Sequence, residues 1–198
     1  MNHVMLDLET LDSGNNAAVV AIGAVHFDPH FKANPPQWFD DDKRILNHFY
    51  RTIDPEDAAK YGTVSGSTFK WWLQQSEQAR SELYRANGKT RDVLKDFNSW
   101  LDRVSENQPR KIALWGNGAT FDNVVLRNAF TAANISPHWH WRGDKCYRTV
   151  INLLPIELQP DVKREGVHHN AMDDALYQVH KLTKTYQLLG IHSGKELV

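Results

Sequence analysis

Several features that would assign a chain to a particular class are scarce in this 198-residue sequence. It has one cysteine, Cys146, which excludes an intramolecular disulfide and is typical of a protein in the reducing cytoplasm. No apolar run approaches the ~20 residues that a membrane span requires. The first residues also lack the charged and apolar regions of a signal peptide. We therefore expect a cytoplasmic protein that does not span a membrane.

The chain also lacks an excess of charge of either sign. It carries 23 basic and 24 acidic residues, a net charge of −1, and a pI of about 6.8. This balance argues against a protein that coats nucleic acid through phosphate contacts alone. It does not argue against an enzyme whose phosphate contacts run through bound cations. With 41% hydrophobic residues, the length predicts a single domain over residues 1–198.

The order of the predicted elements indicates the fold class. Strands are expected at residues 3–8, 17–27, 47–53, 111–115 and 139–141. Helices are expected at residues 55–61, 67–75, 76–86, 90–104, 119–133, 144–154 and 170–189. Three strands joined without helices pair most simply as an antiparallel meander. We therefore predict an α/β fold, in which a mixed five-stranded sheet (an antiparallel meander plus parallel strands) is flanked by helices.

Two acids, Asp7 and Glu9, lie on the first predicted strand. Residues two apart on a strand point to the same face, so both carboxylates leave the sheet together. Like charges on an otherwise apolar strand persist only if a cation compensates them. A competing interpretation ends the strand at Leu6 and leaves both acids in a solvated loop. The β-like pattern that continues through Thr10 and Leu11 favours the first interpretation.

A third acid, Asp122, follows the strand predicted at residues 111–115. The glycines Gly116 and Gly118 allow the backbone to turn tightly before the next helix. Asp122 would then project from the first turn of that helix, near the end of the strand and near Glu9. Taken alone, an acid at this position is more often explained by its favourable interaction with the helix dipole.

The last predicted helix is preceded by two histidines and begins with two acids. Asp173 and Asp174 both lie off the apolar stripe of this helix, so periodicity does not choose between them. His168 and His169 cannot be ranked by pattern either. A histidine beside acids is the group expected to accept a proton from water near neutral pH. The simpler interpretation is two solvent-exposed histidines before a helix.

Together, these segments resemble the DnaQ-like, DEDDh-type 3′→5′ exonucleases, which have the ribonuclease H-like fold. The first family motif, Asp-x-Glu-Thr, matches Asp7, Glu9 and Thr10, and the second ends in Phe-Asp, as at Asp122. The third motif places a histidine five residues before the metal-binding aspartate. The resemblance thereby selects His169 and Asp174, and it covers residues 1–190.

The sequence departs from the common family pattern in two places. Leu11 and Asp12 stand where many members have Thr-Gly, and the second motif begins with Trp115 and Gly116 rather than His-Asn. These departures, with the tryptophan pair at 71–72, resemble the phage exonuclease branch and its bacterial relatives. They leave the positions of the metal ligands intact.

The resemblance implies a two-metal nuclease that releases 5′-mononucleotides from the 3′ ends of single-stranded or overhanging nucleic acid. His169 would be the general base. Two Mg²⁺ ions, for which Mn²⁺ may substitute, would be held by four carboxylates. These are Asp7, Glu9, Asp122 and Asp174.

Further side chains are candidates for substrate contacts. Thr10, Leu11 and Trp71 are the candidates for substrate binding, and the resemblance implies that Leu11 wedges against the terminal base. Trp71 either stacks on a base or packs beneath the loop at residues 28–43. Basic residues that are candidates for phosphate contacts, or for an ordinary solvated face, are Lys43, Arg44, Arg142, Lys145 and Arg148.

Three other functions compete with the exonuclease. A ribonuclease H-like endonuclease would share the carboxylates, and a non-catalytic nucleic-acid-binding module would share the fold. The occupied motif positions argue against both. A zinc site at His138, His140 and Cys146 lacks a fourth ligand at the usual spacing. The sequence leaves the choice between DNA and RNA open, and also the oligomeric state, with a homodimer among the options.

Overall fold

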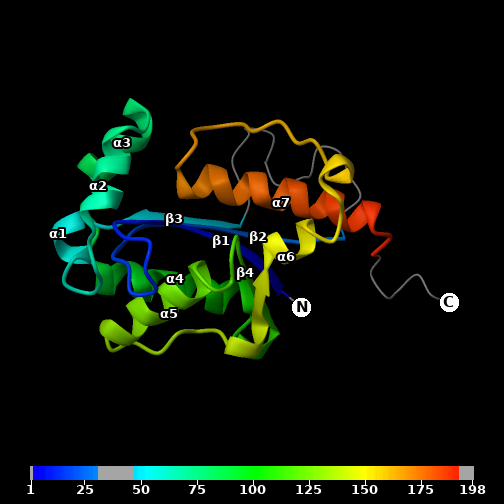
Figure 1. Ribbon diagram of the computed structural model, residues 1–198. Coiled ribbons are helices and arrows are strands. Elements are labelled where there is room, and N and C mark those ends of the chain that lie inside the picture. The colour runs from blue at the N-terminus through cyan, green and yellow to red at the C-terminus, as the bar shows by residue number, and fades with distance from the viewer. Residues whose placement is uncertain (1, 31–46, 192–198) are drawn as a thin grey trace.

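A computed structural model describes residues 2–30 and 47–191. Its centre is a five-stranded sheet of order β3-β2-β1-β4-β5 (Figure 1). β1 pairs antiparallel with β2 and β2 with β3, whereas β4 runs parallel to both β1 and β5. The meander and the mixed sheet predicted from the sequence are therefore confirmed. The strands are β1 Asn2–Thr10, β2 Val19–Phe27, β3 His48–Thr52, β4 Ile112–Gly116 and β5 Asp144–Cys146.

Helices cover both faces of the sheet. In Figure 1, α4 and α5 lie on one face and α6 and α7 on the other. The helices are α1 Pro55–Ala58, α2 Gly66–Leu73, α3 Glu77–Arg85, α4 Thr90–Ser105, α5 Asp122–Ala132, α6 Tyr147–Ile151 and α7 Ala171–Leu188. Short 3₁₀ segments occur at Pro109–Lys111, Trp141–Gly143 and Ile156–Leu158. None of the helices in the described ranges is long and apolar enough to cross a membrane.

The alternation of side chains on β1 determines which face carries its acids. Leu6 and Leu8 belong to the core beneath α4 and α5, together with Leu94, Phe97 and Leu126. Met5 points to the opposite face and packs in the core beneath α7. Because side chains two residues apart share a face, Asp7 and Glu9 follow Met5 toward α7. The strand continues to Thr10, so the acids do not lie in a solvated loop.

A glycine on β2 brings the start of α7 close to this acidic stretch. Gly23 pairs with Asp7 across the two strands. A Cβ added at Gly23 would lie 2.3 Å from the backbone carbon of Ala171, the first residue of α7. Only a residue without a side chain permits this approach. The first turn of α7, which carries Asp174, is thereby placed directly over β1.

The predicted fifth strand at residues 139–141 is wrong. Trp139 is buried, packs edge-on against Phe130, and donates its indole N–H to Asp144 over 3.0 Å. The strand pairing begins only after Gly143, where a Cβ would lie 2.2 Å from the carbonyl oxygen of Ile112. β5 therefore takes residues 144–146, which the sequence had assigned to a helix, and α6 begins at Tyr147.

Candidate active site

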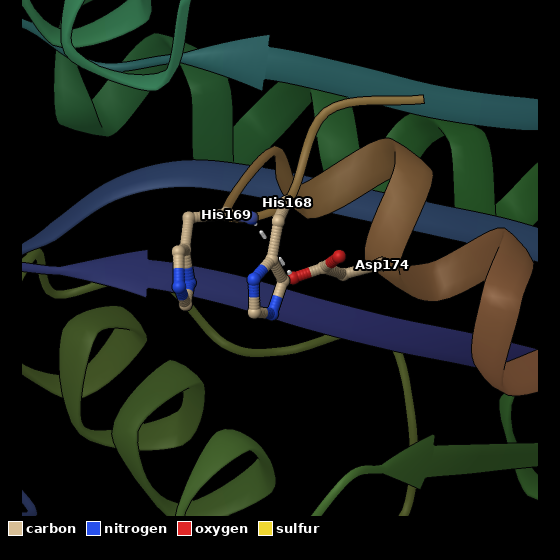
Figure 2. Close-up of side chains that lie close together, drawn as sticks. All are labelled: His168, His169 and Asp174. Atoms are coloured by element: carbon tan, nitrogen blue, oxygen red, sulfur yellow. Dashed lines mark hydrogen bonds between the residues drawn. The ribbon is translucent and has the colours of Figure 1, made fainter. Parts of the chain in front are cut away.

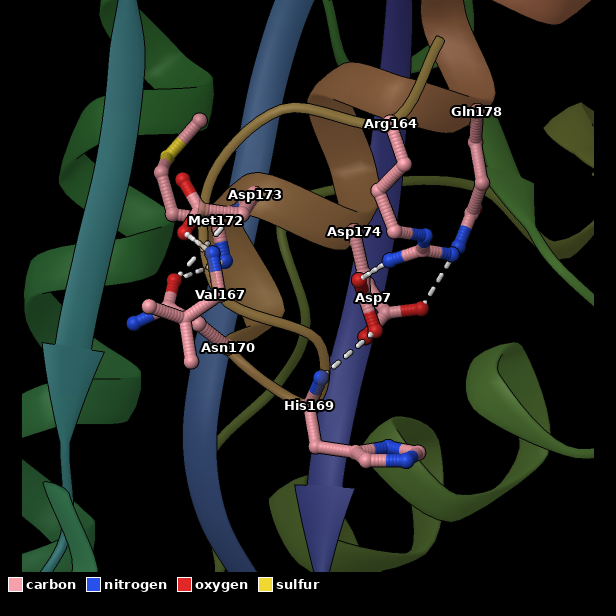
Figure 3. A network of polar contacts seen from close by, with 9 residues as sticks. All are labelled: Asp7, Arg164, Val167, His169, Asn170, Met172, Asp173, Asp174 and Gln178. Carbon is pink, nitrogen blue, oxygen red and sulfur yellow. Dashed lines mark hydrogen bonds and ion pairs between the residues drawn. The ribbon is translucent and has the colours of Figure 1, made fainter. Parts of the chain in front are cut away.

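Four carboxylates from three parts of the chain line one cleft of about 530 Å³. Asp7 and Glu9 come from β1, Asp122 from the start of α5, and Asp174 from the first turn of α7. Each is nearly buried, with at most 8% of the residue exposed. The four acids singled out by the resemblance are therefore gathered in one place. Figure 3 shows Asp7 and Asp174 facing each other between β1 and α7.

Three of these acids are close enough to share one cation. Oxygen atoms of Asp7, Glu9 and Asp174 all lie within 4.8 Å of one another. Burial, followed by repulsion from Asp174 and Asp122, raises the pKa of Glu9 from 4.5 to about 8. Burial and repulsion from the other three acids also raise the pKa of Asp7 well above its ordinary value. Such an arrangement favours a bound proton or a cation over bare charge.

Asp122 is held at the edge of this group by the turn that precedes α5. Its Oδ2 accepts the backbone N–H of Gly118 over 3.1 Å. Burial raises its pKa to about 6, against the opposing effect of this hydrogen bond. A Cβ added at Gly116, the last residue of β4, would lie 2.9 Å from the Asp122 Cβ. The missing side chain of Gly116 therefore permits the close approach of β4 and α5, and the backbone N–H of Gly118 holds the carboxylate of Asp122.

Two polar side chains that the sequence reasoning missed contact these acids. Gln178 is buried and donates from Nε2 to Asp7 over 2.6 Å. The guanidinium of Arg164 pairs with Asp174 and lies over the ring of Tyr177, 4.3 Å from its centroid. Gln178 follows Asp174 by one helical turn, which was a usable signal. Arg164 lies in a loop without periodicity, so only the fold reveals its contact.

The histidines lie at the mouth of the same cleft. The backbone N–H of His169 donates to Asp174 over 3.3 Å. The ring of His169 lies 3.9 Å from that of His168 and 4.6 Å from that of Trp71, measured between centroids. Burial, followed by repulsion from His168, lowers the pKa of His169 below 6.5. Its imidazole is thus biased toward the neutral form that accepts a proton.

The two acids at the start of α7 have different surroundings. Asp174 faces the cleft, whereas Asp173 accepts the backbone N–H of Val167 over 2.7 Å and lies against Gly166. Asn170 caps the helix by accepting from the backbone N–H of Met172 over 3.0 Å. Asp173 therefore fixes the preceding loop, and Asp174 is the acid that joins the carboxylate group.

A second cavity of about 440 Å³ adjoins the first at Leu8, Glu9, Ser13 and Phe121. It is lined by two of the predicted substrate-binding residues, Thr10 and Trp71. Trp71 remains 39% exposed, and its neighbour Trp72 donates its indole N–H to the Thr10 carbonyl over 3.0 Å.

Leu11, the third predicted substrate-binding residue, is half-buried, packs against the core, and lines neither cavity.

The predicted phosphate contacts lie in different places. Arg148 lines the acidic cleft. Arg142 is exposed and lies over the ring of Trp141, and Lys145 is a half-buried residue of β5. Lys43 and Arg44 fall outside the described residues.

The zinc site considered at His138, His140 and Cys146 does not form. In the described ranges, two groups of three such side chains bring their ligand atoms within 4.8 Å of one another, Asp7–Glu9–Asp174 and His168–His169–Asp174, and neither includes these residues.

A family model described as the 3′-5′ exoribonuclease Rv2179c-like domain matches residues 2–186. The exodeoxyribonuclease of Enterobacteria phage T4 is 27% identical over 124 residues, which are 62% of this chain. That match spans about half of the phage relative, 52% of its length.

Two solved structures have the same fold. The nuclease domain of 3′hExo, a DEDDh family member bound to rAMP, matches with a TM-score of 0.59 at 15% identity over 94% of this chain and 92% of that one. Exonuclease I of E. coli, in complex with a dA16 oligonucleotide, matches with a TM-score of 0.55 at 16% identity over 95% of this chain and 41% of that one. These likenesses confirm the predicted ribonuclease H-like fold.

Proposed function

Because this chain belongs to the 3′-5′ exoribonuclease Rv2179c-like family, we propose that it is a metal-dependent 3′→5′ exonuclease. It would release 5′-mononucleotides from the 3′ ends of nucleic acid. The observation that carries the proposal is the convergence of four nearly buried carboxylates from β1, α5 and α7 in one cleft. A histidine with a lowered pKa lies beside them. Stability alone does not account for buried acids that repel one another.

The donor set fits two Mg²⁺ ions, with Mn²⁺ as a substitute. Carboxylate oxygens are the ligands that these hard cations prefer. The raised pKa values of Asp7, Glu9 and Asp122 indicate that the site favours added positive charge. Asp7, Glu9 and Asp174 would hold one ion, and Asp122 with Asp7 would complete the pair. Bound cations would lower the pKa of the attacking water and neutralise the charge on the leaving oxygen.

The chain's own residues supply the proton transfer and the orientation. The neutral imidazole of His169 accepts the proton of the attacking water as general base. Its backbone N–H, donated to Asp174, fixes the loop that carries it. Gln178 orients Asp7 through the hydrogen bond from Nε2. Arg148, a cation on the wall of the cleft, is placed to pair with a substrate phosphate.

The second cavity would receive the terminal nucleotide. Trp71 presents an exposed part of its ring there, and an aromatic face stacks on any base for about 1–3 kcal/mol. Thr10, which follows the shift in register between β1 and β2 after Glu9, lines the same cavity. The family description refers to RNA and the phage relative to DNA. The proposal therefore includes both polymers, each with a free 3′ end.

Digestion of 5′-labelled substrates tests this proposal. Matched single-stranded and duplex forms of RNA and DNA should be shortened stepwise from the 3′ end with Mg²⁺ or Mn²⁺, and chelator should abolish the reaction. Asp7→Asn should be inactive, because it removes a carboxylate from the centre of the group. Closed circles cut as readily as linear strands would instead indicate an endonuclease. Binding without cleavage would indicate a non-catalytic module.

A further inference from the structure

His168 and His169 place their rings on the same side of the chain. Neighbouring side chains of an extended chain point in opposite directions, yet these rings lie 3.9 Å apart and nearly parallel, at 24°. The cause is the backbone of His169, whose φ of +64° is in the left-handed region. A residue other than glycine pays of the order of 1 kcal/mol for this conformation. Figure 2 shows the two rings side by side, with the ring of His168 nearer to the carboxylate of Asp174 in this view.

These three side chains form a second group that could hold a metal ion, and it shares Asp174 with the carboxylate group. A ring nitrogen of His168, one of His169 and a carboxylate oxygen of Asp174 all lie within 4.8 Å of one another. Two imidazoles and a carboxylate suit Zn²⁺ and related transition metals rather than Mg²⁺. Tetrahedral Zn²⁺ needs ligands about 2.0–2.1 Å from the ion. Because His168 is exposed and His169 half-exposed, rotation of the rings can close this distance.

We propose that His168, His169 and Asp174 bind a transition metal ion of the zinc class, and that this ion arrests the nuclease. The second part of the inference rests on the proposed exonuclease function, whereas the binding itself does not. An ion at this site occupies the nitrogen lone pair with which His169 accepts a proton. It also takes an oxygen of Asp174, which belongs to the carboxylate group as well.

An ion can displace Arg164, the side chain that forms an ion pair with the carboxylate of Asp174. Arg164 pairs with this carboxylate, but its guanidinium also lies over Tyr177. Its side chain is 33% exposed. Arg164 therefore retains a contact with the ring, and with water, after an ion has displaced it from Asp174. No step of the proposed reaction uses a nitrogen of His168, so that nitrogen is available as a ligand.

Binding is measured by calorimetric titration of the full chain with Zn²⁺ alone, without substrate. His168→Ala should weaken binding at the histidine site by at least about 100-fold, because even groups behind the ligands contribute about 10–100-fold. His168→Asn should do the same, and it tests whether a shorter polar side chain suffices. His140→Ala is the matched control, since it removes a histidine from a part of the chain outside both metal groups.

Inhibition is measured on the same proteins in the presence of Mg²⁺. Zn²⁺ should arrest the wild type and His140→Ala at low concentration. His168→Ala, compared with its own activity in the absence of Zn²⁺, should require at least about tenfold more Zn²⁺ for the same fractional inhibition. Equal binding and equal inhibition of His168→Ala and the wild type would overturn the inference. A wild type that digests substrate but binds no Zn²⁺ would overturn it as well, and would leave the exonuclease proposal intact.

Discussion

Asp174 belongs to two groups of side chains that could hold a metal ion, and its partners in the two groups differ in how they are positioned. Asp7 and Glu9 are set by the alternation of a central strand, which has neighbours on both sides. His168 and His169 are set by a loop that turns through a left-handed residue. The strand holds carboxylate oxygens, which are hard donors, in fixed positions. The loop carries imidazole nitrogens, which are softer donors and can change position. Because both groups use the carboxylate of Asp174, an ion bound in one group changes the affinity of the other group for a second ion.

The two groups also respond to burial in opposite directions. Burial raises the pKa of Glu9 to about 8 and lowers that of His169 below 6.5. In both cases the low-dielectric surroundings disfavour the charged form. For the acids, a bound cation offsets the cost of placing negative charge in these surroundings. For His169, the same surroundings keep the nitrogen lone pair free near neutral pH, as a general base requires.

The largest effect is expected from a change in the histidine group. His169→Ala should lower the turnover rate by about 10²–10⁴, the usual contribution of a general base. The affinity for Mn²⁺ should change little, because the carboxylates remain. The rate of the wild type should fall as the pH drops through the lowered pKa of His169, because the proton then occupies the accepting nitrogen. Steady-state kinetics across pH, with calorimetric titration of Mn²⁺, measure both quantities.

His168→Ala is the matched control for that change. It removes the neighbouring ring, and the proposed reaction does not use that ring. Without added zinc, it should leave the turnover rate nearly unchanged. An equal loss of turnover in both variants would mean that the role of general base was assigned to the wrong side chain or does not exist.

An intermediate effect, on thermal stability, is expected when one carboxylate of the group is replaced by a neutral amide. The pKa of Glu9 lies above its ordinary value of 4.5, at about 8. Between these values the folded protein binds more protons than the unfolded chain, so the stability of the metal-free protein falls as the pH rises through this window. Glu9→Gln should therefore raise the metal-free Tm at pH 8 by several degrees. Saturating Mn²⁺ should raise the Tm of the wild type and shift that of the variant much less.

Glu157→Gln provides the comparison for this experiment, since Glu157 is exposed in a 3₁₀ segment outside the cleft. Its Tm should follow that of the wild type with and without Mn²⁺ at every pH. Thermal unfolding followed by circular dichroism measures all three proteins. A Glu9→Gln variant that is less stable than the wild type in the metal-free state at pH 8 would contradict the electrostatic account of the site.

The strand acids were predictable and the loop contacts were not, for a physical reason. Alternation along β1 is a local property, so the sequence indicates that Asp7 and Glu9 share a face. The contact between Arg164 and Asp174 depends on how a non-periodic loop closes over α7, which no local pattern encodes. The prediction of the fifth strand was wrong for a similar reason. The aromatic run around Trp139 has the pattern of a strand, but Trp139 packs in the core against Phe130 and donates a part-buried hydrogen bond to Asp144. The choice of Asp174 over Asp173 came from the family resemblance, since periodicity left both open.

The smallest effect is expected on metal affinity when Arg164, which pairs with the carboxylate of Asp174, is replaced. Its guanidinium pairs with Asp174. A metal ion can therefore bind only the fraction of molecules in which this ion pair is broken. The apparent Kd is the intrinsic value divided by that fraction. Arg164→Ala should therefore tighten Mn²⁺ binding by about two- to tenfold, as measured by calorimetric titration at constant ionic strength. Arg164→Ala also removes a positive charge near the site, and the loss of its long-range repulsion of Mn²⁺ lowers the Kd as well.

Lys163→Ala separates the contact from this long-range repulsion, because it removes the same charge from the neighbouring, exposed position of the same loop. Charges exposed to water are screened within about 8–10 Å at physiological salt, whereas a direct contact is screened much less. Arg164→Ala should therefore tighten binding more than Lys163→Ala, and the difference should persist when salt is added. If both substitutions change the Kd equally, Arg164 acts only as one more positive charge. Asp174 would then be as available to an ion with the arginine present as without it.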